Sequence, residues 1–180
     1  MTRCWETTDE GYLAYHDEEW GRPVTAEAAI YERLCLEGFQ SGLSWLTILR
    51  KRPAFREAFA GFDPDAVASF GARDVERLLG DAGIVRHRGK IEAAIANARA
   101  TVALRASESP LPRLFWAHAD GPDGVALSKQ LRAAGFRFVG PTTAYAAMQA
   151  CGVVNDHVAE CIVRADVEAE RRSVLSHPLW

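Results

Sequence analysis

The sequence predicts an all-α fold, and three observations support that class. Apolar residues recur at intervals of three or four over most of the 180 residues, which is the spacing of one helix face. The longest run with the alternating pattern of a strand is "FRFVG" at residues 136–140, and no repeat of fixed length occurs. Hydrophobic residues make up 48% and charged residues 25% of the chain, which is typical of a folded globular domain.

Capping residues, glycine and proline delimit the expected helices. Thr25 is expected to cap the first of them and Asp63 a later one. Gly38 and Gly42 should bracket a break between the first two helices, and Pro53 should end the second. The helices predicted in this way cover residues 25–37, 43–52, 64–70, 75–82, 91–98, 126–134 and 141–151.

The domain organisation is expected to be simple. We predict one α-helical domain over residues 1–165, with two lobes sharing one core, and a loosely attached tail over residues 166–180. No apolar run is long enough to span a bilayer, and the first residues, "MTRCWETTDEG", lack the features of a signal peptide. We therefore expect a cytoplasmic protein. Nothing in the pattern demands a dimer, so a monomer is expected.

Two basic clusters stand out although the net charge is −3 and the pI is near 6.0. "LRKRP" at residues 49–53 is most simply interpreted as a solvated helix end. "VRHRGK" at residues 85–90 lies within "LLGDAGIVRHRGKI", where two helices meet at a glycine-bounded turn and Ile84 fills the angle between them. This pattern indicates a helix-hairpin-helix, whose backbone N–H groups can bind a phosphate. A plain helical hairpin explains the same residues about as well.

Two pairs of cysteine and histidine lie near opposite ends of the chain. His157 and Cys161 are four residues apart in "NDHVAEC" and would share one face of a helix, while Cys4 and His16 form a second pair. Two thiolates and two imidazoles make a closed tetrahedral zinc site, which would act as a clasp. Spacing alone leaves open that these residues are unrelated. The remaining cysteines, Cys35 and Cys151, lie on apolar stripes and are expected to be buried thiols.

A single carboxylate, Glu37, lies among apolar residues in "CLEGFQSGLSW", and Trp45 should face it across the bend that follows. Burying a charge without a partner is costly. Glu37 therefore either points to water or awaits a partner.

Five blocks of the sequence closely resemble, in order, the blocks of the 3-methyladenine DNA glycosylase I family of bacteria: "YLAYHDEEWG", "LCLEGFQSGLSWLTIL", "AGIVRHRGKIEAAIANARA", "ALSKQLRAAGFRFVG" and "MQACGVVNDHVAEC". The resemblance implies a helix-hairpin-helix DNA repair enzyme, a monofunctional hydrolase of N-glycosyl bonds that excises the cationic base 3-methyladenine. It also implies one structural zinc ion. The zinc ligands carried over by position are Cys4, His16, His157 and Cys161.

The resemblance further implies how the substrate, duplex DNA containing alkylated bases, is handled. Glu37 is the expected catalytic residue, acting more by recognition and electrostatics than by proton transfer. The base pocket falls on Tyr12, Tyr15, Trp45 and Trp5. Gln40 or Leu43 is expected to fill the gap left by the extruded base. The hairpin is expected to hold the DNA backbone through Gly83, Arg86, Arg88, Gly89 and Lys90.

Two rival functions remain open. A zinc-clasped helical module could bind damaged DNA without cutting it, and a zinc hydrolase could use the metal directly. A hydrolase needs an open coordination position, whereas four protein ligands close the metal. The non-catalytic module differs from the glycosylase only in turnover.

Overall fold

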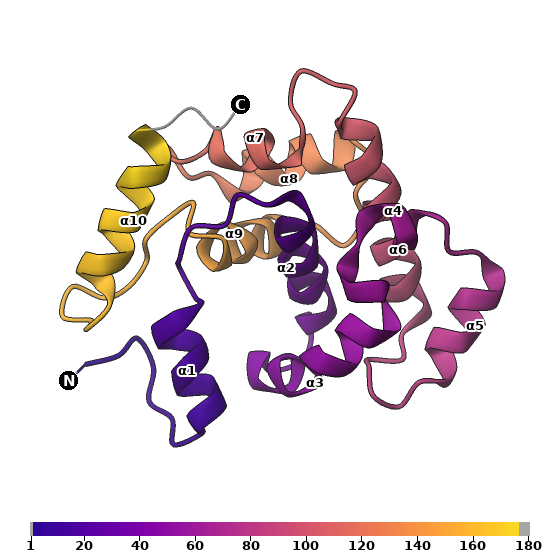
Figure 1. The fold of residues 1–180 in the computed structure, drawn as a ribbon, viewed down its shortest axis with the longest axis horizontal. Helices are drawn as coiled ribbons and strands as arrows, with labels where there is room; N and C mark the ends of the chain where they lie inside the picture. The colour runs from indigo at the N-terminus through magenta and orange to yellow at the C-terminus, as the bar shows by residue number, and fades with distance from the viewer. Residues whose placement is uncertain (1, 177–180) are drawn as a thin grey trace.

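The computed structural model describes residues 2–176, and these residues fold into helices that pack around one large apolar cluster, with a second, smaller cluster at Cys161, Val163 and Val167 (Figure 1). No strand forms among them; Thr2 and Cys161 make only an isolated β-bridge. The predicted all-α class is therefore confirmed. The helices are α1 (Glu10–Glu18), α2 (Glu27–Gln40), α3 (Trp45–Ala58), the 3₁₀ turn η1 (Ala60–Phe62), α4 (Pro64–Ala68), α5 (Ala72–Gly80), α6 (Arg88–Leu104), α7 (Leu111–Trp116), α8 (Gly124–Ala133), α9 (Pro141–Ala150) and α10 (Arg164–Ser176).

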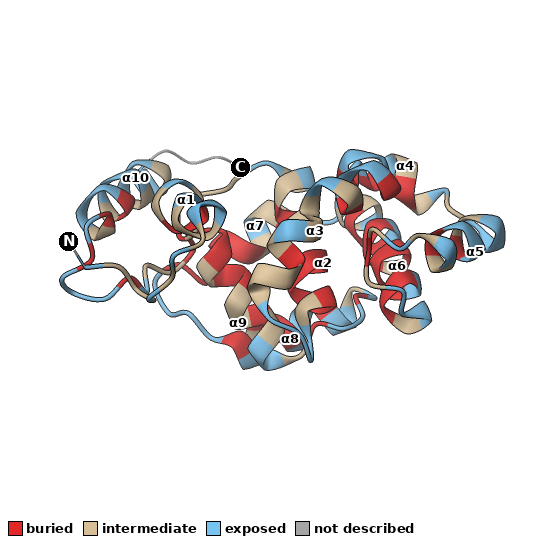
Figure 2. Cartoon of the chain, turned by 90° about the horizontal axis from the view of Figure 1, so that it is seen from below, coloured by how far each residue is buried: buried red, intermediate tan, exposed pale blue. Residues whose placement is uncertain are grey.

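Helix α2 is the centre of the molecule. It packs against α9 on one side and α6 on the other, and Figure 2 shows buried residues concentrated on α2 and α6. Ile30, Tyr31 and Leu34 have no exposed surface, and they belong to one apolar cluster that extends from α2 to the end of α9. A helix buried on most of its circumference holds its end in a fixed place, and Glu37 lies in the last turn of α2.

Several helix boundaries follow the predicted signals. Asp63 caps α4, whose first residue is Pro64, and Asp123 caps α8 by accepting the N–H groups of Val125 and Ala126. Gly135 ends α8 with a positive φ of 99°. Local sequence is sufficient here because each signal acts within a few residues of the helix end.

The break predicted at Gly38 is wrong. Helix α2 continues through Gly38 to Gln40, and the turn is made at Gly42, where φ is +82°. Gly38 packs close to the segment before α9, because a Cβ there would lie 3.4 Å from the carbonyl oxygen of Phe138. The glycine thus serves packing between α2 and the segment before α9.

The prediction that Pro53 ends a helix is also wrong, because α3 passes through it to Ala58. Phe55 and Ala58, on the far side of the proline, are both buried. The ring of Phe55 packs on Phe39 of α2 with centroids 4.7 Å apart. Burial of this apolar face offsets the hydrogen bond that proline cannot donate.

The tail expected after residue 165 is a helix, α10, up to Ser176; residues 177–180 of that prediction lie outside the described residues. Val167 of α10 is fully buried. Arg171 donates hydrogen bonds to the carbonyl oxygens of Val153, at 2.9 Å, and Ala119. The sequence signal was weak because this helix is held mainly by polar contacts to distant backbone.

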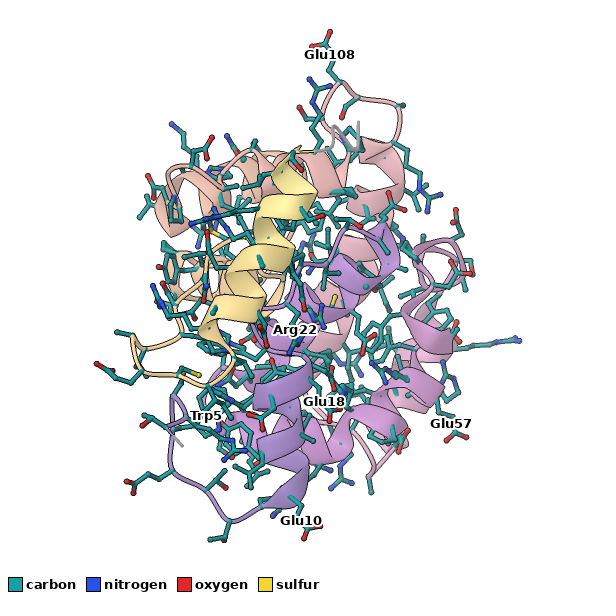
Figure 3. The ribbon with its side chains drawn as sticks, turned by 60° about the vertical axis from the view of Figure 1, so that its left-hand side comes forward. Trp5, Glu10, Glu18, Arg22, Glu57 and Glu108 are labelled. Atoms are coloured by element: carbon teal, nitrogen blue, oxygen red, sulfur yellow. The ribbon has the colours of Figure 1, made fainter. Side chains whose placement is uncertain are left out.

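Helix α1 was not predicted, although Asp9 caps it by accepting the N–H of Tyr12 at 2.9 Å. Its far end is tied to α10 through Arg22, which donates to the carbonyl oxygen of Asp17 and pairs with Glu170. Figure 3 shows the Arg22 side chain where α1 and α10 approach each other. The two ends of the chain therefore lie side by side.

No helix within residues 2–176 is long and apolar enough to cross a membrane.

Lys90, an expected phosphate contact, has a different role. Its side chain is buried, and its Nζ donates to the carbonyl oxygens of Phe39 at 2.9 Å and Ser41 at 2.6 Å. The last carbonyls of a helix have no partner within it, so Lys90 caps the end of α2 from α6. The ammonium is thus turned into the protein, which corrects the expectation that it grips DNA.

Replacing Lys90 by methionine should lower the free energy of unfolding by about 1–3 kcal/mol, because the buried carbonyl of Phe39 and the partly buried carbonyl of Ser41 lose a charged donor. Urea denaturation would measure the change. Lys129→Met is the matched control, since Lys129 is exposed. Equal stability of the two variants would show that the cap contributes nothing.

Candidate functional site

A pocket of about 150 Å³ opens between α1, the facing ends of α2 and α3, and α9. The four residues assigned to the base pocket from the sequence and the expected catalytic residue Glu37 all line it, and Gln40 joins them. The complete lining is Trp5, Tyr12, Tyr15, Trp20, Glu37, Gln40, Trp45, Ala146 and Gln149.

Glu37 is the only acidic side chain in this lining, and no basic side chain lines the pocket to compensate its charge. Its side chain is 8% exposed, and it forms no hydrogen bond or ion pair with any residue in the range 2–176. Burial raises the pKa of this carboxyl to about 7. The second possibility raised by the sequence, a buried carboxylate that awaits a partner, is the one that the structure supports.

Aromatic rings surround the carboxylate on several sides. Trp5 stacks on Tyr12 with centroids 5.0 Å apart, and Tyr12 lies 6.5 Å from Tyr15. Tyr15 in turn lies 5.2 Å from Trp45. Electron-rich ring faces around one carboxylate favour a flat, positively charged guest.

Two of these rings also carry buried donors. The indole Nε1 atoms of Trp5 and Trp45 are buried and have no hydrogen-bond partner among the described residues. Unsatisfied polar groups are rare in folded proteins and are costly. Their presence at the pocket marks a site built for a ligand or ordered water.

Sequence reasoning missed three lining residues, Trp20, Ala146 and Gln149. Trp20 ends the block that contains Tyr12 and Tyr15, so its position beside two predicted residues was an available signal. Ala146 and Gln149 come from α9, and nothing local to their sequence indicates a pocket.

The turn between α2 and α3 lies at the pocket. Leu43, expected to enter the base stack, is 43% exposed there. Gln40, the other candidate, lines the pocket itself. Both remain available to a molecule that approaches this turn.

The helical hairpin predicted around residues 78–91 forms from α5 and α6, and Ile84 fills the angle between them with 3% exposure. Arg86 is exposed, while Arg88 pairs with Glu76 at 2.7 Å. The N–H of Gly83 already donates to Asp81 at 2.7 Å. This hairpin therefore offers Arg86 and the first turn of α6, including Gly89, more readily than Gly83.

Four side chains from the two ends of the chain converge beside this pocket. The ligand atoms of Cys4, His16, His157 and Cys161 all lie within 4.8 Å of one another. Sγ of Cys161 is 3.5 Å from Nε2 of His16. The predicted convergence is thus present.

The predicted local structure of this cluster is wrong in one respect. His157 and Cys161 lie in an irregular segment between α9 and α10, and not on one helix. Cys161 is held instead by the bridge to Thr2, where the N–H of Ile162 donates to the Thr2 carbonyl at 3.1 Å. Contact between the chain ends replaces helical spacing as the cause of convergence.

Hydrogen bonds orient both imidazoles. Nδ1 of His16 lies 2.7 Å from Oδ1 of Asp17, and Nδ1 of His157 lies 3.1 Å from Oδ1 of Asn155. These partners leave Nε2 of each ring to face the cluster, and Nε2 of His157 is buried with no partner in the described chain. Gly21 fits against His157, because a Cβ there would lie 2.5 Å from its ring.

Cys35 and Cys151 are buried away from the cluster, as predicted. Burial raises the pKa of each thiol to about 12. They are therefore neutral core residues.

Comparison with known proteins agrees with this site. The family model described as methyladenine glycosylase matches residues 5–124 and 118–165. DNA-3-methyladenine glycosylase 1 of Escherichia coli (strain K12) is 46% identical over 179 residues, which cover 89% of this chain and 96% of that protein.

Solved structures of related enzymes share the fold of this chain. A crystal structure of 3-methyladenine DNA glycosylase I has a TM-score of 0.85 at 44% identity and covers 89% of this chain and 98% of its own. A structure of the Staphylococcus aureus enzyme, solved for the basis of 3-methyladenine recognition, has a TM-score of 0.84 at 34% identity, over 88% of this chain and 93% of its own. The chain belongs to the methyladenine glycosylase family.

Proposed function

We propose that this protein is a DNA base-excision repair glycosylase that removes 3-methyladenine from alkylated DNA. The observation that carries the proposal is Glu37, a buried carboxylate without a partner inside an aromatic pocket. The names of its relatives supply the reaction and the substrate. The residues of this chain supply a physical reason for both.

Charge is the basis of discrimination. A 3-methylated adenine in DNA is a cation, so its entry gives the Glu37 carboxylate the partner that it lacks, whereas normal adenine is neutral. Tyr15 and Trp45 lie where they can contact the cationic ring, and cation–π attraction contributes on the order of 1 kcal/mol or more once water is excluded. Recognition therefore needs no readout of the surrounding sequence.

The base must leave the duplex to reach the pocket, which costs a few kcal/mol and less for a damaged base. The exposed Leu43 and the pocket residue Gln40 lie at the turn that the vacated stack would meet. The α5–α6 hairpin acts as a helix-hairpin-helix, in which Arg86 and the start of α6 at Gly89 contact the phosphate backbone.

Cleavage of the glycosidic bond needs little acid catalysis. The bonding electrons pass to the departing base, which neutralises its positive charge, and water adds to the cationic sugar carbon that remains and releases a proton to solvent. Glu37 stabilises the cationic base on entry and faces the positive charge that moves to the sugar. Its raised pKa does not make it a proton donor here, because the leaving group carries its charge already.

Purified protein should release 3-methyladenine from methylated duplex DNA far faster than it releases 7-methylguanine. Glu37→Gln should slow that release by about 10²-fold or more, because an amide keeps the shape but removes the charge. Chromatography with mass spectrometry of the free bases measures both. Glu57→Gln is the control, since Figure 3 shows Glu57 pointing away from the protein.

Full activity of Glu37→Gln with unchanged selectivity would refute the role of the charge. Tight binding of methylated DNA with no base release by the wild-type protein would favour a non-catalytic DNA-binding module instead.

The buried carboxyl also predicts how stability depends on pH. The pKa of Glu37 is about 7 in the folded protein and near 4.5 when unfolded, so folding favours its protonated form. The cost of burying the charge is absent below pH 4.5 and accumulates as the pH rises through 7. Glu37→Gln should therefore be more stable than the wild type by up to about 3 kcal/mol at pH 8, and much less so at pH 5.

Urea denaturation of both proteins at the two pH values tests this expectation. Only the difference between them is compared, so a metal lost at low pH affects both alike. A stability difference that does not change with pH would show that Glu37 is not buried as a charge.

Zinc is the proposed metal ion, and its ligands would be Cys4, His16, His157 and Cys161. Zn–S bonds of about 2.3 Å and Zn–N bonds of about 2.0 Å place neighbouring ligand atoms of a tetrahedral site about 3.3–3.8 Å apart. The distance of 3.5 Å between Cys161 and His16 fits that range. Burial lowers the pKa of His157 to about 4, so its ring is neutral and can coordinate. The bound ion would hold the chain ends together.

The protein should contain one zinc ion per chain, and its removal by a strong chelator should lower the melting temperature. Cys161→Ser should lose the metal and Cys151→Ala should retain it, because only Cys161 belongs to the cluster. Elemental analysis and thermal unfolding measure the two effects. Wild-type protein that contains no metal after growth with zinc would contradict the proposal.

A further inference from the structure

Two arginines of α3 bind the two residues that cap α1. Arg50 donates to Asp9, the N-cap of α1, at 2.6 Å, and Arg52 donates to Glu19, its C-cap, at 2.6 Å through both terminal nitrogens. Both arginines come from the basic cluster at residues 49–53 that the sequence alone indicated to be a solvated helix end. Most of this cluster's charge is therefore directed at α1.

The two contacts differ in strength. The Arg50 side chain is 66% exposed and makes a single contact, and exposed pairs of that kind contribute little. The Arg52 side chain is 16% exposed and its planar fork binds both oxygens of Glu19. A bidentate, partly buried pair fixes distance and direction at once.

The same faces of α1 and α3 that carry this pair also form the pocket wall. Tyr15 and Glu19 are four residues apart on α1, and Trp45 and Arg52 are seven apart on α3, so each pair shares one helix face. Tyr15 packs on Trp45 at 5.2 Å, and the guanidinium carbon of Arg52 lies 5.9 Å from the Tyr15 ring centroid. Tyr15 is thus held by α3 at two points.

A second cavity, of about 60 Å³, shares Tyr15 and Trp45 with the main pocket and is lined mostly by charged side chains, among them Glu19, Arg33 and Arg52. Within α1, only Tyr15 and His16 are buried. A ring that lacks close-packed core behind it keeps its place only if the charged groups there are fixed.

We propose that the Arg52–Glu19 ion pair is a positioning element of the pocket, which locks the α1 wall against α3 and keeps Tyr15 closed over Glu37. Neither residue lines the pocket. Loss of the pair lets α1 move outward, widens the pocket at Tyr15 and admits water to Glu37. The inference rests on the proposed function only where it concerns catalysis.

The first test measures the pKa of the Glu37 carboxyl by carbon NMR, with its signal assigned from the Glu37→Gln spectrum. Opening of the wall should lower that pKa by about one unit in both Arg52→Met and Glu19→Gln, because water then solvates the charge. A purely electrostatic role would give opposite signs, since removal of a cation raises the pKa of a nearby carboxyl and removal of an anion lowers it. Opposite signs, or no shift in either variant, would overturn the proposal.

Two further variants keep the test decisive. The double variant should shift the pKa no more than Glu19→Gln alone, because Glu19→Gln already removes the contact to Arg52 together with the longer contact to Arg33 at 3.9 Å. Arg52→Lys keeps the charge but not the fork, so it should show a smaller shift even if Arg52→Met folds poorly. Arg105→Met is the control: Arg105 binds Glu27 at 2.6 Å and Asp65 at 2.9 Å near the opposite end of α2, and its loss should leave Glu37 unchanged.

The second test is kinetic. Arg52→Met and Glu19→Gln should raise KM for 3-methyladenine release about tenfold, with a smaller change in kcat. Both variants alter the shape of the pocket but leave the Glu37 carboxylate in place. Unchanged KM in both variants would count against the lock. Failure of the wild-type protein to release the base would refute the proposed function alone, because the NMR measurement uses no DNA.

Discussion

The uncompensated burial of Glu37 is the constraint on which the rest of the structure depends. A carboxylate in an apolar pocket destabilises the folded chain unless the elements that carry it are held by other contacts. Helix α2 supplies them, because it is buried along most of its length and its last carbonyls are capped by Lys90. The fold thus tolerates a charge whose partner arrives with the substrate, and this tolerance is what selectivity for a cation requires.

The opposite wall of the pocket is built in a different way. Helix α1 is short, and two of its adjacent residues belong to different sites: Tyr15 lines the pocket and His16 belongs to the Cys–His cluster. A chain of ring contacts from Trp5 through Tyr12 and Tyr15 to Trp45 connects the N-terminal segment to α3. The position of this wall is therefore determined by contacts between segments far apart in sequence.

That difference explains which features could be predicted from the sequence. Caps such as Asp63 and Asp123 act within a few residues, and most of the pocket and cluster residues were found because they occur in recognisable blocks, although Cys4 and Trp5 lie before the first block. The roles of Lys90 and Pro53 were predicted wrongly, because each depends on a partner elsewhere: the end of α2 for Lys90, and for Pro53 the aromatic core that receives Phe55. Helix α10 was missed for the same reason.

Two of the polar attachments of α1 also explain how this side of the pocket can serve recognition. On one side the cluster at His16 ties it to the C-terminal segment, and on the other Arg52 ties it to α3 through Glu19. Both attachments are polar, so each holds a distance while filling little space beside Tyr15, which lines the pocket. A hydrophobic attachment of equal strength would cover the side of Tyr15 that lines the pocket, because apolar contact is non-directional and grows with area. Directional polar contacts thus keep the pocket open and its width fixed.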